Sequence, residues 1–211
     1  MTETCGTLTI GSYDYDDHLI EEVLRTRQPR LKVYRAPLTA VVIGRGGKPD
    51  IELHLDAIAR DGVPVLRRNG GGCAVVIDAG NLVVSVALPV NGIKDNRKYF
   101  DRITDWLIGK LQETGLESVQ QRGISDLAIG DRKIGGSCIY RTNQYLYYST
   151  TILLTADLSL IDRYLKHPPR EPDYRYSRPH LDFVMNVGEM EGLEDRDWGD
   201  ESLSLIPDKT E

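Results

Sequence analysis

Three stretches of the chain repeat apolar residues at the spacing of an amphipathic helix. They are residues 16–27, 51–60 and 96–112. Apolar residues at intervals of three and four lie on one face of a helix, so each stretch has a face that can pack on a core. A fourth, shorter helix is predicted over 157–165, where Asp157 is well placed to cap the first turn.

Shorter runs that are apolar, or that alternate between apolar and polar residues, predict strands because they end at glycine, proline, asparagine or aspartate. The predicted strands are 31–35, 39–44, 63–66, 75–77, 82–87, 127–129, 133–141 and 144–154. A short turn at Thr142 and Asn143 joins the last two. Helices and strands are therefore mixed along the chain, and no internal repeat is visible.

The pattern changes after about Val187. Acidic residues dominate from there to the end of the chain, and few apolar residues anchor them. Segments of this composition bury too little apolar surface to offset the entropy lost on ordering. We therefore predict one catalytic domain over residues 1–187, followed by a mobile, solvated acidic tail over 188–211.

Length, charge and cysteine content limit the function classes. A chain of 211 residues is most simply one domain, and its net charge of −6 comes without a run of lysine and arginine, which argues against nucleic-acid binding. The three cysteines are widely spaced and form no CxxC pair, so neither a disulfide framework nor a zinc site is predicted. No apolar run approaches the ~18 residues of a membrane span. We expect a cytoplasmic protein without a signal peptide or a membrane partner.

A glycine-rich loop lies between two of the predicted strands. Arg67 and Arg68 precede it, and Gly70, Gly71 and Gly72 form it. Glycine lets the main chain approach a ligand closely with its N–H groups available to an anion, and arginine supplies planar, permanently charged donors. The alternative interpretation is a hairpin turn with two surface arginines.

A second informative stretch reads SDLAIGDRKIGGSCIY. Lys133 leaves a turn at Gly130 and Asp131, and a pair of glycines follows within two residues. This order is suited to bringing an ammonium to a phosphate or carboxylate held against bare backbone. The alternative is a solvated lysine beside a turn, and the stretch by itself does not decide between the two.

Together the two stretches resemble a known family. The two signature segments of the lipoate–protein ligases, relatives of the octanoyltransferases and biotin–protein ligases, are matched by RRNGGGCAVVIDAGN and GDRKIGGSCIYR. A third family segment is matched by TTILLTADLSLIDRYL, and weaker matches are VVIGRGGKPDIELHL and SRPHLDFVMNV. The resemblance covers roughly residues 10–187, and the order and spacing of the segments make it specific.

The resemblance implies an α/β fold of the α+β type, in which mixed, largely antiparallel sheets pack with helices around a bifurcated pocket. The implied reaction uses ATP and Mg²⁺ to activate lipoate as lipoyl-AMP. The lipoyl group then passes to a lysine of an apo lipoyl-carrier domain or a glycine-cleavage-type carrier protein. The chain has no match to the accessory domain of the two-domain ligases, so it resembles a single-domain form that acts alone or with a separate accessory subunit.

The resemblance also implies roles for individual residues. Lys133 is the implied catalytic residue, in contact with the activated carbonyl and the phosphate. The residues implied to contact the lipoyl group or the adenylate are Arg68, Gly70, Gly71, Gly72, Cys73, Asn81, Gly136, Ser137 and Thr151. The residues implied to handle phosphates are Arg67, Asp78 and Asp126, and Asp126 is also the implied metal contact. Such donors suit a mixed anhydride, which concentrates negative charge as it forms.

Three single positions depart from the family pattern, and Tyr148, Ser149 and Thr150 replace the family's His-Gly approach to Thr151. Cys73 stands in place of the last glycine of the loop, Ile77 in place of a histidine and Ser125 in place of an asparagine. Cys73 would narrow the loop or point at the ligand, so the preference between lipoate and octanoate stays open. Two other functions also stay open. One is an ATP-independent acyl transferase that uses Cys138 or Cys73 as a nucleophile, and the other is a module that binds lipoate or a carrier without transfer.

Overall fold

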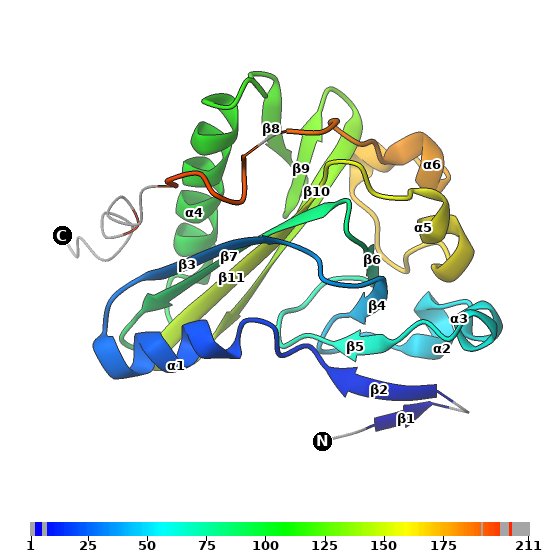
Figure 1. Cartoon of the computed structure of the whole chain (residues 1–211), viewed down its shortest axis with the longest axis horizontal. Coiled ribbons are helices and arrows are strands. Elements are labelled where there is room, and N and C mark those ends of the chain that lie inside the picture. Colours follow the sequence, from blue (N-terminus) through cyan, green and yellow to red (C-terminus); the bar gives the residue numbers. More distant parts are fainter. Residues whose placement is uncertain (1–2, 6–7, 191, 199–202, 204–211) are drawn as a thin grey trace.

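Two β-sheets organise the fold, as Figure 1 shows for the computed structural model of the chain. The structure describes residues 3–5, 8–190, 192–198 and 203. Its helices are α1 (Asp17–Thr26), α2 (Pro49–Glu52), α3 (Leu55–Asp61), α4 (Asn96–Gln112), α5 (Ser159–Tyr164), the 3-10 helix η1 (Asp173–Arg175) and α6 (His180–Phe183). Among the described residues, no helix combines the length and the apolar character that crossing a bilayer requires.

The larger sheet contains six strands, each antiparallel to its neighbours, in the order β3-β7-β11-β10-β9-β8. They are β3 (Arg30–Arg35), β7 (Asn81–Pro89), β8 (Val119–Arg122), β9 (Asp126–Ile129), β10 (Arg132–Arg141) and β11 (Tyr145–Leu153). Strand β7 is buried from Asn81 to Leu88, so both of its faces are covered. This is why its sequence is one continuous apolar run and does not alternate.

The smaller sheet has the order β1-β2-β5-β4-β6. Its strands are β1 (Glu3–Cys5), β2 (Leu8–Ser12), β4 (Ala40–Ile43), β5 (Val65–Arg67) and β6 (Val75–Ile77). Strand β5 pairs in parallel with β2 and β4, and the outer pairs are antiparallel. The predicted α+β fold with mixed, largely antiparallel sheets is confirmed.

Helix α4 covers one face of the larger sheet (Figure 1). Its buried side chains are Tyr99, Phe100, Ile103, Thr104, Leu107 and Leu111. They pack with alternate residues of β7, namely Leu82, Val84, Val86 and Leu88. Full burial of an aliphatic or aromatic side chain contributes roughly 1.5–3 kcal/mol, so this layer is a large source of stability. The opposite face of the sheet is left to the glycine loop, helix α1 and the smaller sheet.

The structure corrects one predicted helix. The stretch 51–60 contains two helices, α2 and α3, because the chain is extended between them. Leu53 forms an isolated bridge with Leu165, and the N–H of His54 donates to the carbonyl of Tyr164 at 2.8 Å. The helical spacing of the apolar residues therefore describes α3 but not α2.

Three strands are absent from the sequence prediction: β1, β2 and β8. Strand β8 reads Val-Gln-Gln-Arg and lies at one edge of the larger sheet. An edge strand of this kind needs few apolar residues, because one side of it has no neighbouring strand. Strand β1 is the corresponding edge strand of the smaller sheet, and the short strand β2 lies between β1 and β5.

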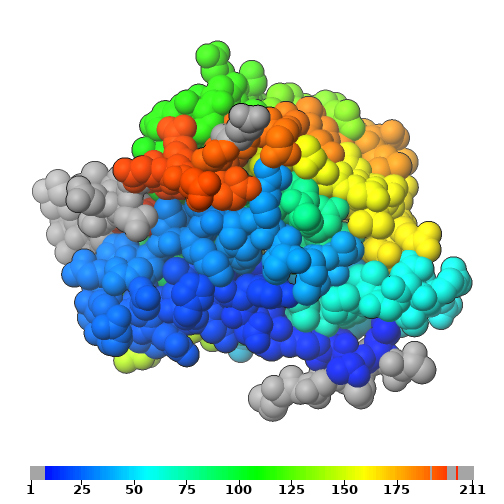
Figure 2. All heavy atoms as spheres, in the orientation of Figure 1, coloured from blue at the N-terminus to red at the C-terminus, as the bar shows by residue number. Residues whose placement is uncertain are grey.

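The acidic segment is the second correction. Among the described residues beyond 187, Leu193, Trp198 and Leu203 are buried, and Trp198 Nε1 donates to the carbonyl of Leu193 at 2.8 Å. Glu194 forms an ion pair with Arg35 of β3, and in Figure 2 the orange-red segment lies across the blue surface of that region. The prediction of a mobile, solvated tail is wrong for these residues because three large apolar side chains anchor them in the core. The domain boundary at residue 187 stays a prediction, and the end of the tail lies outside the described residues.

Candidate functional site

Four of the predicted site residues meet on the face of the larger sheet opposite α4. Asp126, Gly136 and Thr151 lie side by side in register across β9, β10 and β11. Lys133 lies at a β-bulge in β10, and its Nζ donates to Asp126 Oδ1 at 2.7 Å. Its side chain is 27% exposed, so the ammonium remains accessible from solvent.

Glycine leaves the space beneath this lysine free of a side chain. A Cβ built on Gly136 would lie 3.0 Å from Lys133 Nζ and 3.2 Å from its Cε, so the lysine lies directly over bare backbone. A Cβ on Gly135 would lie 2.5 Å from the carbonyl oxygen of Thr151, a contact that main chain cannot relieve without moving the strands. Gly136 therefore lets the Lys133 side chain lie against the main chain of β10, and Gly135 lets β11 approach β10 closely.

Asp126 has a second partner that the sequence did not indicate. The hydroxyl of Tyr174, in η1, donates to Asp126 Oδ2 at 2.9 Å, and both residues are buried. Burial, and then the negative charge of Asp126, raises the pKa of Tyr174, so the phenol keeps its proton and acts as the donor. The two residues are 48 positions apart, and no family-like motif includes Tyr174.

Asp126, the implied metal contact, is bound by two donors in this arrangement. One of its oxygens accepts from Lys133 and the other from Tyr174. The described residues contain no group of three His, Cys, Asp or Glu side chains that could hold a metal ion. Mg²⁺ in nucleotide sites keeps several waters and is held by one or two carboxylates together with the phosphates, so the metal contact implied for Asp126 stays a prediction.

Arg68 sets the shape of the glycine loop. Its guanidinium donates to the main-chain carbonyls of Gly71 and Cys73, both at 2.8 Å, and to that of Val42 in β4 at 3.1 Å. Gly72 has φ of 96°, a left-handed conformation that favours glycine. The arginine thus holds the loop by its carbonyls and attaches it to the smaller sheet.

Arg67 is also bound to main chain. Its Nη1 donates to the carbonyls of Gly44 and Gly47, each at 3.0 Å. Glu52 reinforces this corner, since its Oε2 accepts from the N–H of Ala74 at 2.6 Å. The Arg67 guanidinium therefore binds the main chain of the loop after β4. The role in phosphate handling implied for Arg67 stays a prediction.

The glycine loop lies against the same strand that carries Lys133. A Cβ on Gly70 would lie 2.6 Å from the sulfur of Cys138, so only glycine allows this approach. Cys138 is on the Gly136 face of β10, two residues further along. Burial raises the pKa of its thiol, although the nearby Arg68 guanidinium lowers it in part. The two motifs that the sequence singled out are brought together here.

Asp78 and Asn81 hold the turn between β6 and β7. Asn81 Oδ1 accepts from the N–H of Asp78, and Asp78 accepts from the N–H groups of Gly80 and Asp157, each at 2.8 Å. The Nδ2 group of Asn81 is buried without a hydrogen-bond partner among the described residues. These contacts tie the turn to the loop before α5, so the predicted ligand contacts of this pair stay predictions.

Ser137 and Cys73 are implied as ligand contacts, and these assignments stay predictions. Ser137 pairs with Thr150, and its hydroxyl bonds to Thr150 and to the hydroxyl of Tyr148, at 3.0 and 2.8 Å. Tyr148 packs on Phe100 of α4, so the Ser137 side chain lies on the sheet face away from Lys133. Cys73 is half-buried, and its thiol lies 3.7 Å from the carbonyl of Arg170.

A second polar cluster, also missed from the sequence, lies on the Lys133 face of the sheet. Asp16 is 3% exposed, and its Oδ2 accepts from Ser85 and Tyr147 at 2.6 Å and from Tyr34 at 3.2 Å. Burial, and then the charge of Asp16, raises the pKa of Tyr147 well above its usual value. The hydroxyl donors come from three elements, so no local sequence pattern marks them.

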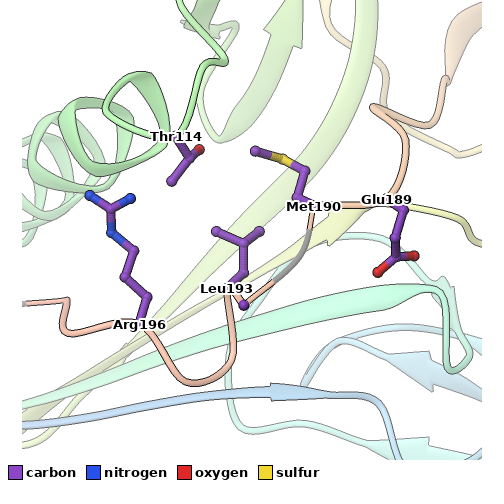
Figure 3. Close-up of a pocket in the computed structure, with 6 residues that line it drawn as sticks. Thr114, Glu189, Met190, Leu193 and Arg196 are labelled. Atoms are coloured by element: carbon purple, nitrogen blue, oxygen red, sulfur yellow. The ribbon is translucent and has the colours of Figure 1, made fainter.

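Two open hollows on the surface lie elsewhere. One, of about 530 Å³, is lined by Thr114, Glu189, Met190, Leu193 and Arg196 (Figure 3), and the other, of about 580 Å³, lies between α3 and α5. Arg196 already pairs with Glu113 at 2.7 Å. No predicted site residue lines either hollow, so we assign the candidate chemistry to the lysine site.

The fold and the site define a class of protein: a two-sheet α+β domain in which an arginine-held glycine loop lies against the strand that carries a partly exposed lysine. The chain belongs to the family of the lipoyl protein ligase A/B catalytic domain, whose model matches residues 12–194.

Curated relatives carry related names. The chain is 31% identical over 131 residues to the lipoate-protein ligase A of Psychrobacter cryohalolentis, covering 61% of this chain and 36% of that protein. It is 28% identical over 149 residues to the lipoate–protein ligase of Streptococcus pyogenes, covering 71% and 43%. The chain thus spans less than half the length of these relatives.

Solved structures share the fold. A bi-partite lipoate protein ligase from Thermoplasma acidophilum, described with its E2 lipoyl domain, superposes with a TM-score of 0.67 at 23% identity and covers 94% of this chain and 79% of that one. A lipoate-protein ligase A bound with ATP superposes with a TM-score of 0.63 at 24% identity and covers 88% and 74%. At these identities the likeness establishes the fold.

Proposed function

We propose that the chain is the catalytic part of an ATP-dependent lipoate–protein ligase. One observation carries the proposal: the Lys133 ammonium lies over the bare backbone of Gly136, on the sheet face that the loop of Arg68 and Gly70 also contacts. The family membership and the names of the relatives support it. Structural neighbours described with bound ATP and with bound lipoic acid support the choice of substrates.

The chemistry has two steps. In the first, a carboxylate oxygen of lipoate attacks the α-phosphorus of ATP, pyrophosphate leaves, and lipoyl-AMP forms. In the second, the amine of the carrier lysine attacks the lipoyl carbonyl, AMP leaves, and an amide forms with loss of a proton from the amine. Negative charge develops on the α-phosphate in the first step and on the carbonyl oxygen in the second.

Lys133 is suited to stabilise both charges. A fixed ammonium aimed at oxygen atoms where charge develops lowers the barrier without reorganisation. The Arg68-held loop would close over the acyl adenylate, with the main-chain N–H groups of Gly70, Gly71 and Gly72 as further donors. Thr151 lies beside Gly136 in register, at the margin of the same surface. Mg²⁺ would enter with the nucleotide, and no step here is assigned to it.

The alternatives fit less well. An acyl transferase with Cys138 as the nucleophile needs a thiolate near neutral pH, whereas burial raises the pKa of this thiol. A module that binds lipoate without transfer would not need a partly exposed ammonium over a glycine. We therefore retain the ligase and treat both alternatives as outcomes of its test.

The partner is a carrier protein with an acceptor lysine, either a lipoyl domain or a glycine-cleavage-type carrier. A structural neighbour described as a bi-partite ligase together with its E2 lipoyl domain supports this choice. The same description supports our further proposal that a separate accessory subunit assists the reaction.

The test is the mass of an apo lipoyl domain after incubation with the protein, ATP, Mg²⁺ and lipoate. We expect the mass to rise by one lipoyl group, and omission of ATP to abolish the rise. Transfer from octanoyl acyl carrier protein without ATP would establish the transferase. Binding of lipoate or of the carrier without transfer, even with a relative's accessory domain added, would establish the binding module.

A further inference from the structure

A chain of three buried or half-buried groups ends at the reactive ammonium. The Tyr174 hydroxyl donates to Asp126 Oδ2 at 2.9 Å, and Asp126 Oδ1 accepts from Lys133 Nζ at 2.7 Å. We propose that Tyr174 is a positioning residue for Lys133 and that it acts through Asp126. The proposal rests on the proposed function of Lys133 and adds a residue that lies outside the family-like motifs.

The ammonium needs such a support. A lysine side chain has four rotatable bonds and a compact charge without directional preference. Asp126 can fix it only if the carboxylate itself does not rotate. Because the Tyr174 hydroxyl engages one oxygen, the other oxygen faces Nζ, which lies over Gly136. The tyrosine therefore determines where along β10 the positive charge lies.

The ring of Tyr174 is held independently of its hydroxyl. The Arg122 guanidinium lies 4.6 Å from the ring centroid, and the ring of Phe183 lies 5.1 Å away. Tyr174 is 5% exposed. Replacement of Tyr174 by phenylalanine keeps this packing and removes the hydrogen bond to Asp126, which makes it a clean test of positioning.

The segment that carries Tyr174 also holds the backbone of Lys133. Val184 forms a parallel bridge with Lys133, and the N–H of Met185 donates to the carbonyl of Lys133 at 2.9 Å. Arg132 adds a bond to the carbonyl of Val184 at 2.6 Å. Residues 174–185 thus contact Lys133 through both its main chain and, by way of Asp126, its ammonium.

The chain offers a matched control in Tyr164. It is 4% exposed, and its hydroxyl donates to Asp61 Oδ2 at 2.9 Å, in a pair of the same chemistry on α5 and α3. Tyr164→Phe therefore removes an equivalent bond away from Lys133. Any effect common to both variants reports lost structure, and an effect confined to Tyr174→Phe reports positioning.

The kinetic test compares Tyr174→Phe, Tyr164→Phe and Asp126→Asn in lipoyl transfer to an apo lipoyl domain. We expect Tyr174→Phe to lower kcat about tenfold with KM for ATP and lipoate within about twofold, because misplacement of a catalytic group affects the transition state most. Tyr164→Phe should keep the wild-type kcat. The double variant Tyr174→Phe/Asp126→Asn should lose no more than Asp126→Asn alone, since both act on one chain of contacts. An unchanged kcat in Tyr174→Phe, or additive losses, would overturn the proposal.

A second readout does not depend on the ligase reaction. Trace acetylation with acetic anhydride, followed by peptide mass spectrometry, measures how readily Lys133 reacts. We expect several-fold faster labelling of Lys133 in Tyr174→Phe than in wild type or Tyr164→Phe, because a released carboxylate restrains the amine less. Equal labelling in all three would refute the positioning role. Faster labelling in a protein that transfers no lipoyl group would keep the positioning role and refute the proposed function.

Discussion

Two lysine–aspartate pairs lie on the same face of the larger sheet, towards its opposite edges. Lys133 Nζ is 2.7 Å from Asp126 Oδ1 at β9 and β10, and Lys32 Nζ is 3.6 Å from Asp16 Oδ1 at β3. In both pairs the other carboxylate oxygen accepts from a tyrosine hydroxyl. The lysine side chains are also similarly exposed, at 27% and 30%.

The surroundings of the two ammonium groups differ. Lys32 Nζ donates to the carbonyl of Tyr15 at 2.7 Å and lies 4.2 Å from the ring centroid of Tyr34. Lys133 lies over Gly136, which has no side chain to cover it. An ion pair with aspartate therefore does not by itself mark a reactive lysine. The glycine beneath Lys133 distinguishes it, because a ligand can approach backbone that carries no side chain.

The largest expected effect comes from removing each ammonium in turn. Lys133→Met should lower lipoyl transfer by roughly 10²–10³-fold, as expected for loss of a donor aimed at developing charge. Lys32→Met should leave the rate within about twofold of wild type, because its ammonium is committed to the protein itself. Single-turnover rates with an apo lipoyl domain measure both. Equal losses in the two variants would remove the distinction between the pairs.

Removal of the aspartates should affect the free energy of unfolding in the opposite order, with the larger loss at Asp16. Asp16→Ala leaves three hydroxyl groups without their buried acceptor and should cost about 3 kcal/mol of unfolding free energy. Asp126→Ala should cost less, about 1–2 kcal/mol, because the partly exposed Lys133 can turn to water. Urea denaturation measures both values. A larger loss for Asp126→Ala would mean that the lysine site, and not the Asp16 cluster, is the main polar support of the fold.

A smaller effect is expected from adding one methyl group beneath Lys133. In Gly136→Ala the new Cβ meets Nζ at 3.0 Å, so the lysine must shift by a few tenths of an ångström. We expect transfer to fall roughly fivefold with little change in stability. Gly109→Ala in α4 is the control, since its Cβ has no neighbour within 4 Å. A wild-type rate for Gly136→Ala would show that the position of the ammonium has more tolerance than proposed.

The smallest effect concerns alkaline pH. The pKa of Tyr147 is raised by burial and then by Asp16, so the folded protein keeps a proton that the unfolded chain loses near pH 10. Its contribution to stability is therefore complete below about pH 10 and declines above it, by at most about 1.4 kcal/mol per pH unit. Tyr147→Phe should flatten that decline. Urea midpoints at pH 8 and pH 11 for both proteins measure it, and parallel declines would contradict the assignment.

The sequence predicted the part of the site that lies on neighbouring strands. Lys133, Gly136 and Asp126 fall within 11 residues of one another, and strand pairing brings them together in a hairpin register. Tyr174 escaped prediction because it reaches Asp126 across 48 residues from a short 3-10 helix. The sequence did not indicate that the Ser137 side chain lies on the α4 face of the sheet, since a motif does not specify which sheet face a neighbouring residue takes.

The fold shows the same limit. Helix α4 was predicted because its buried residues recur at helical spacing, and strand β7 because its buried residues form one continuous apolar run. The prediction for the acidic segment was wrong because three apolar residues, Leu193, Trp198 and Leu203, are buried in the core. Composition describes the average of such a segment, whereas burial depends on its few large side chains.

The most direct test of the central claim separates the two steps of the proposed reaction. Preformed lipoyl-AMP is mixed with an apo lipoyl domain and with wild-type protein or Lys133→Met, and the carrier mass is followed over time. We predict rapid gain of one lipoyl group with wild type and a rate lower by at least about 10²-fold with Lys133→Met. Transfer at the wild-type rate by Lys133→Met would contradict the assignment of Lys133 to the reacting carbonyl.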